Sequence, residues 1–359
     1  MKLNLLNFAI FILLMAGFTN RLSAQEMITK KNKPVSEVPV PDSSDRNNNF
    51  YDNAPTYALK GSGIEILGEV ENPGQVVFSE LKKHSVIVKE TMLTADGTDK
   101  FTGAYRYDGY SLFDILNERF LKKKNAAEFN PIIDLYVVIE NDKGDKVIVS
   151  WGEIYYPTRL HQIIIATDVA RIVPSKTKDL WPLPTEQKLV IGSDLVTERN
   201  ISNPTKITVV SYGRSIKVDR NIDPIYSPEI QVYAKNKVAD RISDISTFQK
   251  QTFQTIFYGR GRGIHSTTPF NGVCVKDYFA IHFPVNKSNL KTGMFVFVGK
   301  DGYRTVYSYS EVMNRNDQAE LLIVNCEKDK ESGKFRIFPA SDFFSDRAVK
   351  AVSDIYFEE

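Results

Sequence analysis

The chain has 359 residues, of which 42% are hydrophobic, and it carries 46 Lys and Arg against 44 Asp and Glu. This near balance argues against a general nucleic-acid binder or a protein held on an anionic membrane, since both need a basic surplus. The chain has only two cysteines, Cys274 and Cys326, so it is not a scaffold built on disulfides.

The first 24 residues have the layout of a secretory signal peptide. Lys2 precedes an apolar run from Leu5 to Phe18, and Leu22-Ser23-Ala24 places small residues before Gln25. The run is shorter than the roughly 20 apolar residues that a membrane span needs. We therefore expect a periplasmic or secreted protein with no transmembrane segment in the mature chain.

Residues 25–58 are rich in Lys, Pro, Ser, Asp and Asn, with three consecutive asparagines from Asn47. Such a composition cannot bury an apolar face, so we expect a disordered tether. The alternative is a tail that binds a partner.

The rest of the chain is expected to alternate between strands and short helix starts. Helix starts are expected at Ser79 and within Tyr107–Leu116. Alternating apolar residues and turn signals predict strands at 64–70, 135–139, 146–151, 162–166, 188–191 and 207–210. The second and third of these strands flank the turn 141–145, which predicts a hairpin.

The same order of segments then returns about 160 residues later. The matched segments and residues are Ser79-Glu80-Leu81 with Ser243-Asp244-Ile245, Asp114 with Asp277, Ser150 with Ser308, Glu153 with Glu311, and Asp194 and Arg199 with Asp342 and Arg347. We therefore expect two homologous domains, residues 59–212 and 225–359. The repeated glutamates are expected to cap a turn, and each repeated Asp and Arg to form an ion pair within the fold.

The first copy resembles the molybdopterin-binding domain of the sulfite oxidase family. The resemblance rests on Gly68-Glu69-Val70-Glu71-Asn72-Pro73, Ser79-Glu80-Leu81, the segment Tyr107–Leu116, and Arg199 before residues 207–210. It implies an α+β fold, made here of two tandem copies of a sulfite-oxidase-like mixed-sheet domain.

In that family a cysteine thiolate ahead of the aromatic–glycine segment ligates molybdenum, a metal that favours soft sulfur donors. The corresponding stretches here, residues 93–98 and 257–262, contain no cysteine. We therefore expect no bound cofactor, no metal ligand and no catalytic residue, with molybdopterin held through an oxygen donor such as Asp96 as the alternative. Both cysteines are expected to be buried, inert thiols. The four histidines show no metal-binding spacing, so surface or capping roles are expected for them.

The glycine-rich run Tyr258–Ser266 is the best candidate for a binding loop. Its glycines allow close approach of a ligand to the backbone, and its two arginines can hold a carboxylate or phosphate. The resemblance places the loop at the former cofactor pocket, where the candidate binding residues are Asp96, Gly97, Arg260, Arg262 and His265. The alternative is a solvated turn that uses glycine for its backbone angles.

Three functions are consistent with these features. The leading hypothesis is an exported, non-catalytic binding or scaffold protein for a small anionic ligand or an envelope protein. The second is a molybdopterin-dependent oxidoreductase with altered metal ligation. The third is an accessory subunit of an envelope transport or secretion assembly, attached through residues 25–58.

Overall fold

The computed structural model describes residues 50–51, 54–326 and 333–359. The expected signal peptide and most of the expected tether lie outside the described residues. Within the tether segment, Thr56–Ala58 forms strand β1, which pairs antiparallel with β8 (Ile163–Arg171). None of the helices in the described part of the chain has the length and apolar character needed to span a membrane.

The structure is mostly β, with 43% strand and 12% helix, and its sheets form a four-bladed, β-propeller-like arrangement. The expectation of an α+β fold with two sulfite-oxidase-like mixed-sheet domains is therefore wrong. Both expected helix starts are followed by very little helix. Ser79 lies inside the 3₁₀ helix η2 (Phe78–Glu80), and the N-cap residue of η2 is Val77, which makes no side-chain cap hydrogen bond. Ser111 caps α2 by accepting a hydrogen bond from the Asp114 N–H, yet α2 spans only Leu112–Asn117. The residues before it belong to the long strand β5 (Asp99–Ser111), in which Tyr105 and Tyr107 are buried.

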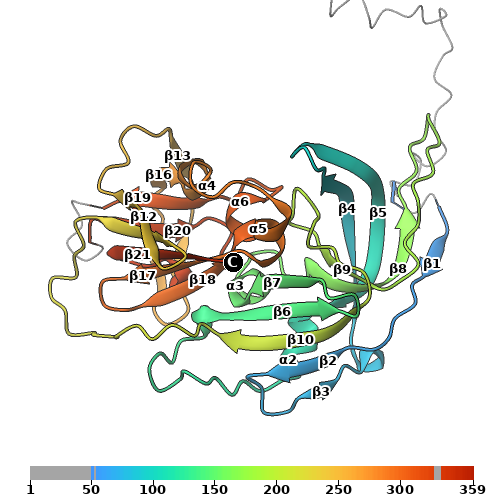
Figure 1. Ribbon diagram of the computed structural model, residues 1–359, viewed down its shortest axis with the longest axis horizontal. Coiled ribbons are helices and arrows are strands. Elements are labelled where there is room, and N and C mark those ends of the chain that lie inside the picture. Colours follow the sequence, from blue (N-terminus) through green and yellow to red (C-terminus); the bar gives the residue numbers. More distant parts are fainter. Residues whose placement is uncertain (1–49, 52–53, 327–332) are drawn as a thin grey trace, which may run out of the picture. The chain divides into compact units, whose positions relative to one another are not determined.

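The first half of the chain contains two sheets, coloured blue to green in Figure 1. In one, the strand order is β1-β8-β5-β4 with β9 also on β8; in the other it is β3-β2-β10-β6-β7. The remaining elements of this half are β2 (Glu65–Gly68), β3 (Gly74–Gln75), η2 (Phe78–Glu80), β4 (Lys83–Leu93), η3 (Ile132–Asp134), β6 (Leu135–Asn141), β7 (Lys146–Ser150), α3 (Trp151–Tyr155), β9 (Lys188–Ile191) and β10 (Pro204–Ser211).

The second half, coloured yellow to red in Figure 1, has sheets of order β12-β11-β21-β17-β18 and β13-β16-β19-β20, and a separate hairpin β14-β15. Its elements are β11 (Ile230–Ala234), β12 (Lys237–Ile242), β13 (Lys250–Phe253), β14 (Phe257–Gly259), β15 (Gly263–Ser266), β16 (Phe270–Cys274), α4 (Val275–Phe279), α5 (Lys287–Thr292), β17 (Met294–Gly299), β18 (Arg304–Ser308), α6 (Tyr309–Met313), β19 (Leu321–Asn325), β20 (Phe335–Pro339), η4 (Ser345–Arg347) and β21 (Val352–Glu358).

The two halves have sheets of equivalent topology. In each, the first strand of one sheet pairs in parallel with the last strand of the half, β2 with β10 and β11 with β21. Gly109 and Gly272 occupy equivalent places for the same reason: a Cβ there would meet the carbonyl oxygen of Ile165 or Ile323 on the neighbouring strand. The residues from 49 onward form one compact unit, and the domain boundaries drawn from the sequence stay a prediction.

Contacts between the halves come in exchanged pairs, as in an isologous dimer. The backbone of Asp194 forms an isolated β-bridge with that of Arg315, and Pro157 forms the equivalent β-bridge with Asp342. The Leu195 N–H donates to the Asn314 carbonyl, and the Phe343 N–H donates to the Tyr156 carbonyl. Each half therefore supplies backbone hydrogen-bond partners to the other. We call this contact region, which includes residues 156–157, 194–195, 314–315 and 342–343, the seam.

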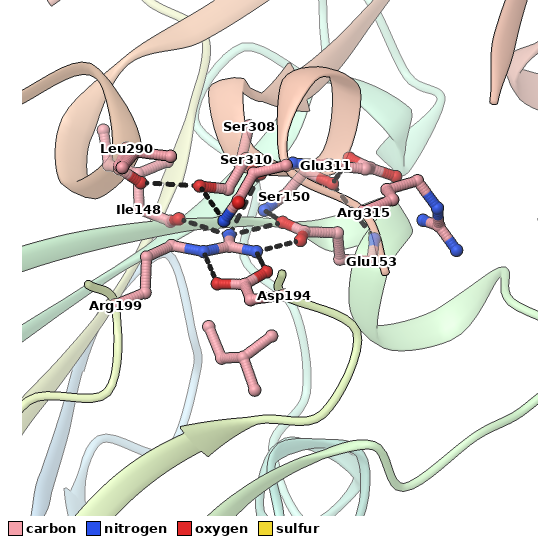
Figure 2. Close-up of polar contacts among 12 residues, drawn as sticks. Ile148, Ser150, Glu153, Asp194, Arg199, Leu290, Ser308, Ser310, Glu311 and Arg315 are labelled. Carbon is pink, nitrogen blue, oxygen red and sulfur yellow. Dashed lines mark hydrogen bonds and ion pairs between the residues drawn. The ribbon is translucent and has the colours of Figure 1, made fainter. Parts of the chain in front are cut away.

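A buried cluster of charges lies at the seam (Figure 2). Arg199 pairs with Asp194 at 2.6 Å, and Arg347 pairs with Asp342 at 2.7 Å, which confirms the two ion pairs expected from the sequence. Glu153 completes a capping box with Ser150 on α3, as expected for a capping glutamate.

The two charge sites are joined across the seam by serines. Arg199 Nη1 donates to Ser308 Oγ of the second half at 3.0 Å, and Ser150 Oγ donates to Glu311 Oε2 at 2.7 Å. Each cap serine therefore also forms a hydrogen bond with a residue of the other half.

Candidate functional site

A cavity of 610 Å³ lies in the second half of the chain. This volume is in the range of pockets that take small molecules. Its lining combines aromatic, basic and acidic side chains, the main ones being Phe257, Arg262, His265, Phe270, Asp301, Tyr303, Arg336, Asp346 and Lys350.

The hairpin β14-β15 forms one side of the cavity. Tyr258 pairs with Ile264 and Gly259 with Gly263, and Gly263 has a φ of 74°, which suits glycine in a tight turn. A Cβ on Gly259 would lie 2.4 Å from His265 Nε2, so the missing side chain makes room for the imidazole. The glycine-rich composition of the run thus places His265 against the backbone of its own hairpin.

Aromatic rings form the apolar wall of the cavity. The rings of Phe257 and Phe270 lie 5.1 Å apart, and Phe270 stacks on Phe338 at 4.0 Å. The Arg336 guanidinium lies over the Phe257 ring, with its Cζ 4.5 Å from the ring centroid. This cation–π contact holds a positive charge against an apolar surface.

Charged groups complete the lining. Arg262 and Lys350 are exposed, and they add two further positive charges to that of Arg336. On the acidic side, Asp346 Oδ1 lies 3.6 Å from Arg260 Nη2. Asp346 Oδ2 is buried and accepts no hydrogen bond from the residues that the structure describes, which leaves an acceptor for a ligand hydroxyl or amine.

Tyr303 contributes a fixed ring rather than a titrating group. Its hydroxyl donates to the Asp346 carbonyl oxygen at 2.7 Å. Burial, with a further contribution from Asp346, raises the pKa of Tyr303 well above its usual value. The phenol therefore stays protonated and holds η4 in place beside the cavity.

The structure brings together only some of the residues selected from the sequence. Arg262 and His265 line the cavity, whereas Arg260 lines a separate cavity of 300 Å³. Asp96 and Gly97 lie in the turn between β4 and β5, in the first half. There the Asp96 carboxylate accepts hydrogen bonds from the Thr94 and Thr98 hydroxyls, which lower its pKa.

Sequence reasoning missed Arg336, Lys350 and the aromatic wall. One signal for Arg336 was present: it stands between Phe335 and Ile337, both fully buried, on strand β20. A cation in the middle of such an apolar run is costly to bury unless it has a specific contact. Lys350 had no comparable signal.

The two cysteines differ in their surroundings. Cys274 is a buried thiol, as expected, and burial raises its pKa to about 12. Cys326 forms no disulfide, has intermediate exposure and lines the cavity, so the expectation that it is buried is wrong.

Searches for similar proteins give no identification: no family model matches the sequence, and no curated protein matches it. The chemistry of the site therefore has to be inferred from the side chains that line it.

Proposed function

We propose that the protein is an exported binding protein that holds a small anionic ligand with a planar apolar part in the cavity of its second half. The observation that carries this proposal is the Arg336 guanidinium, held over the Phe257 ring and supplemented by Arg262 and Lys350. Cationic side chains bind carboxylate, sulfonate or phosphate groups through charge-assisted hydrogen bonds. The phenylalanine rings offer faces on which an apolar ring can stack.

The oxidoreductase alternative drew its support from the fold resemblance, which the structure does not share, so we do not propose it. The alternative of an accessory envelope subunit depends on residues 25–58, most of which lie outside the described residues. It stays a prediction.

Two dyes that differ by a single charged group test the proposal. Anilinonaphthalene sulfonate and phenylnaphthylamine share their rings, but only the first carries a sulfonate. We expect the double variant Arg262→Gln/Lys350→Gln to weaken sulfonate binding about 10-fold or more, because two cationic contacts are lost. Binding of the neutral dye is expected to change less than about two-fold. Dye fluorescence titrations measure both dissociation constants.

The control replaces a lysine outside the cavity, Lys235→Gln, which removes one positive charge from a highly exposed side chain. It should leave both dissociation constants unchanged. The proposal would be contradicted if the double variant bound both dyes equally more weakly, or if its dissociation constant for the sulfonate dye were unchanged.

A further inference from the structure

Two histidines and one aspartate meet in the first half, although they lie far apart in the sequence. His84 is near the start of β4, Asp114 is in the first turn of α2, and His161 lies two residues before β8. Their side chains are partly exposed, at 17%, 23% and 31%, respectively. The fold therefore assembles a group of nitrogen and oxygen donors that solvent can reach.

The donor atoms are close together. His84 Nε2 lies 2.7 Å from Asp114 Oδ2, and His161 Nδ1 lies 3.5 Å from the same oxygen. One donor atom from each of the three residues lies within 4.8 Å of the others. The two imidazole rings stack with centroids 4.0 Å apart and planes 5° apart.

The surroundings hold these groups in position. The Ser111 hydroxyl is fully buried, donates to Asp114 Oδ2 at 2.7 Å and lies 3.0 Å from His161 Nδ1. The Phe113 ring packs edge-on against His161. His161 has a φ of 62°, an uncommon value for a residue other than glycine, and this backbone turn directs its ring to the cluster.

The second half shows that the fold does not itself require the two imidazoles. His84 pairs with Gly109, and the residue that pairs with the equivalent Gly272 is Gln251. The position two residues before β19, equivalent to that of His161 before β8, is Ala319. The helix-start aspartate alone recurs, as Asp277. Asp114 thus has a counterpart in the first turn of the equivalent helix, whereas the two histidines have none at the equivalent positions.

We propose that His84, Asp114 and His161 bind one divalent transition-metal ion, with Zn²⁺ as the best match. Two imidazoles and one carboxylate, with water at the open position, form a common three-residue zinc site. A single carboxylate is too few for Ca²⁺, which takes six to eight oxygen ligands, and Mg²⁺ also prefers oxygen. To direct both nitrogens to one ion, the stacked rings have to turn about their Cβ–Cγ bonds.

Imidazole nitrogen NMR of the unaltered, chelator-treated protein tests the site directly, because the chain has only four histidines. Titration with Zn²⁺ is expected to shift the signals of His84 and His161 and to leave those of His265 and His282 in place. Calorimetry on the same sample is expected to give one Zn²⁺ per chain, with no displacement by Ca²⁺ or Mg²⁺. An absence of binding, or shifts confined to His265 or His282, would overturn the assignment.

Three variants assign the ligands. His84→Gln, Asp114→Asn and His161→Ala are each expected to weaken Zn²⁺ binding about 100-fold or more, since even outer partners of a metal site are worth 10–100-fold. The matched control is His282→Gln, because His282 Nε2 also lies beside a carboxylate, 2.9 Å from Asp240. The Zn²⁺ affinity of His282→Gln should equal that of the unaltered protein, and an equal loss of Zn²⁺ affinity in this control would refute the site. If a metal-free variant does not fold, as judged by its thermal melting, the NMR titration of the unaltered protein decides the question.

Discussion

Replacing Arg199 by Met is expected to lower the free energy of unfolding by about 3–5 kcal/mol, and Arg347→Met is expected to cost about the same. Both guanidinium groups are fully buried. Arg199 lies between Asp194 and Glu153, at 2.6 and 2.7 Å. Methionine fills much of the space but leaves two carboxylates buried without a countercharge. That loss of a partner is more costly than the pair itself is favourable.

Urea unfolding followed by the fluorescence of the two tryptophans measures the effect. Arg241→Met is the control, because Arg241 forms an exposed pair with Glu229 at 3.5 Å. Exposed ion pairs contribute roughly 0–1 kcal/mol, so this variant should stay within that range. A loss below about 1 kcal/mol for both buried arginines would contradict the expectation that the seam depends on their charges.

The double variant Arg199→Met/Arg347→Met tests whether the two sites act together. Arg199 donates to Ser308, and Arg347 Nη1 lies 3.4 Å from Ser150, so each arginine reaches the cap serine of the other half. Residues in one hydrogen-bond network give non-additive losses. We therefore expect the double variant to lose less than the sum of the two single losses.

Local signals in the sequence were sufficient for the hairpins and the ion pairs. The alternation at 135–139 and 146–151 predicted the hairpin formed by β6 and β7, which pair antiparallel around the expected turn. Asp194 and Arg199 are close in the sequence, so their repetition at a second place was enough to indicate an ion pair. Both cases depend on interactions within a few residues.

The fold class could not be obtained in the same way, because it depends on pairing between distant strands. β2 and β10 pair in parallel although Glu65 and Lys206 are far apart in the chain. The histidine cluster has the same origin, since register and loop geometry bring His84 and His161 together and no short spacing records it. Arg262 and His265 were found only because they share one hairpin.

Glu153 and Glu311 occupy equivalent places in the two halves, yet their pKa values are expected to shift in opposite directions from the usual glutamate value. Burial opposes ionisation of Glu153, but the charge and hydrogen bonds of Arg199, with Ser308 and the Ser150 N–H, outweigh it and lower its pKa. Burial raises the pKa of Glu311; Arg347 opposes this rise, but the charge of Glu153 adds to it. Two carboxylates this close at one seam ionise less readily together than either does alone.

These directions give opposite pH dependences for two matched variants. A lowered pKa in the folded state stabilises the protein above the unfolded value of about 4.3, and this stabilisation is lost as the pH falls through the folded value. Glu153→Gln should therefore cost most near neutral pH, about 3 kcal/mol, and progressively less in acid. A raised pKa has the reverse effect, because ionising Glu311 costs stability as the pH rises through its folded value. Glu311→Gln removes that cost, so the stability of this variant should gain on that of the unaltered protein as the pH rises above the unfolded value of about 4.3.

Urea unfolding of both variants and of the unaltered protein, measured both below and above the unfolded glutamate pKa of about 4.3, provides the comparison. The difference curve for Glu153→Gln should slope below the unfolded pKa and that for Glu311→Gln above it, with opposite signs. Parallel curves would mean that the two carboxylates hold protons equally, and that the serine contacts across the seam do not distinguish them. Opposite slopes would show that the two equivalent glutamates share one negative charge unequally. Glu153 in the first half would then be ionised, and Glu311 in the second half would carry the proton.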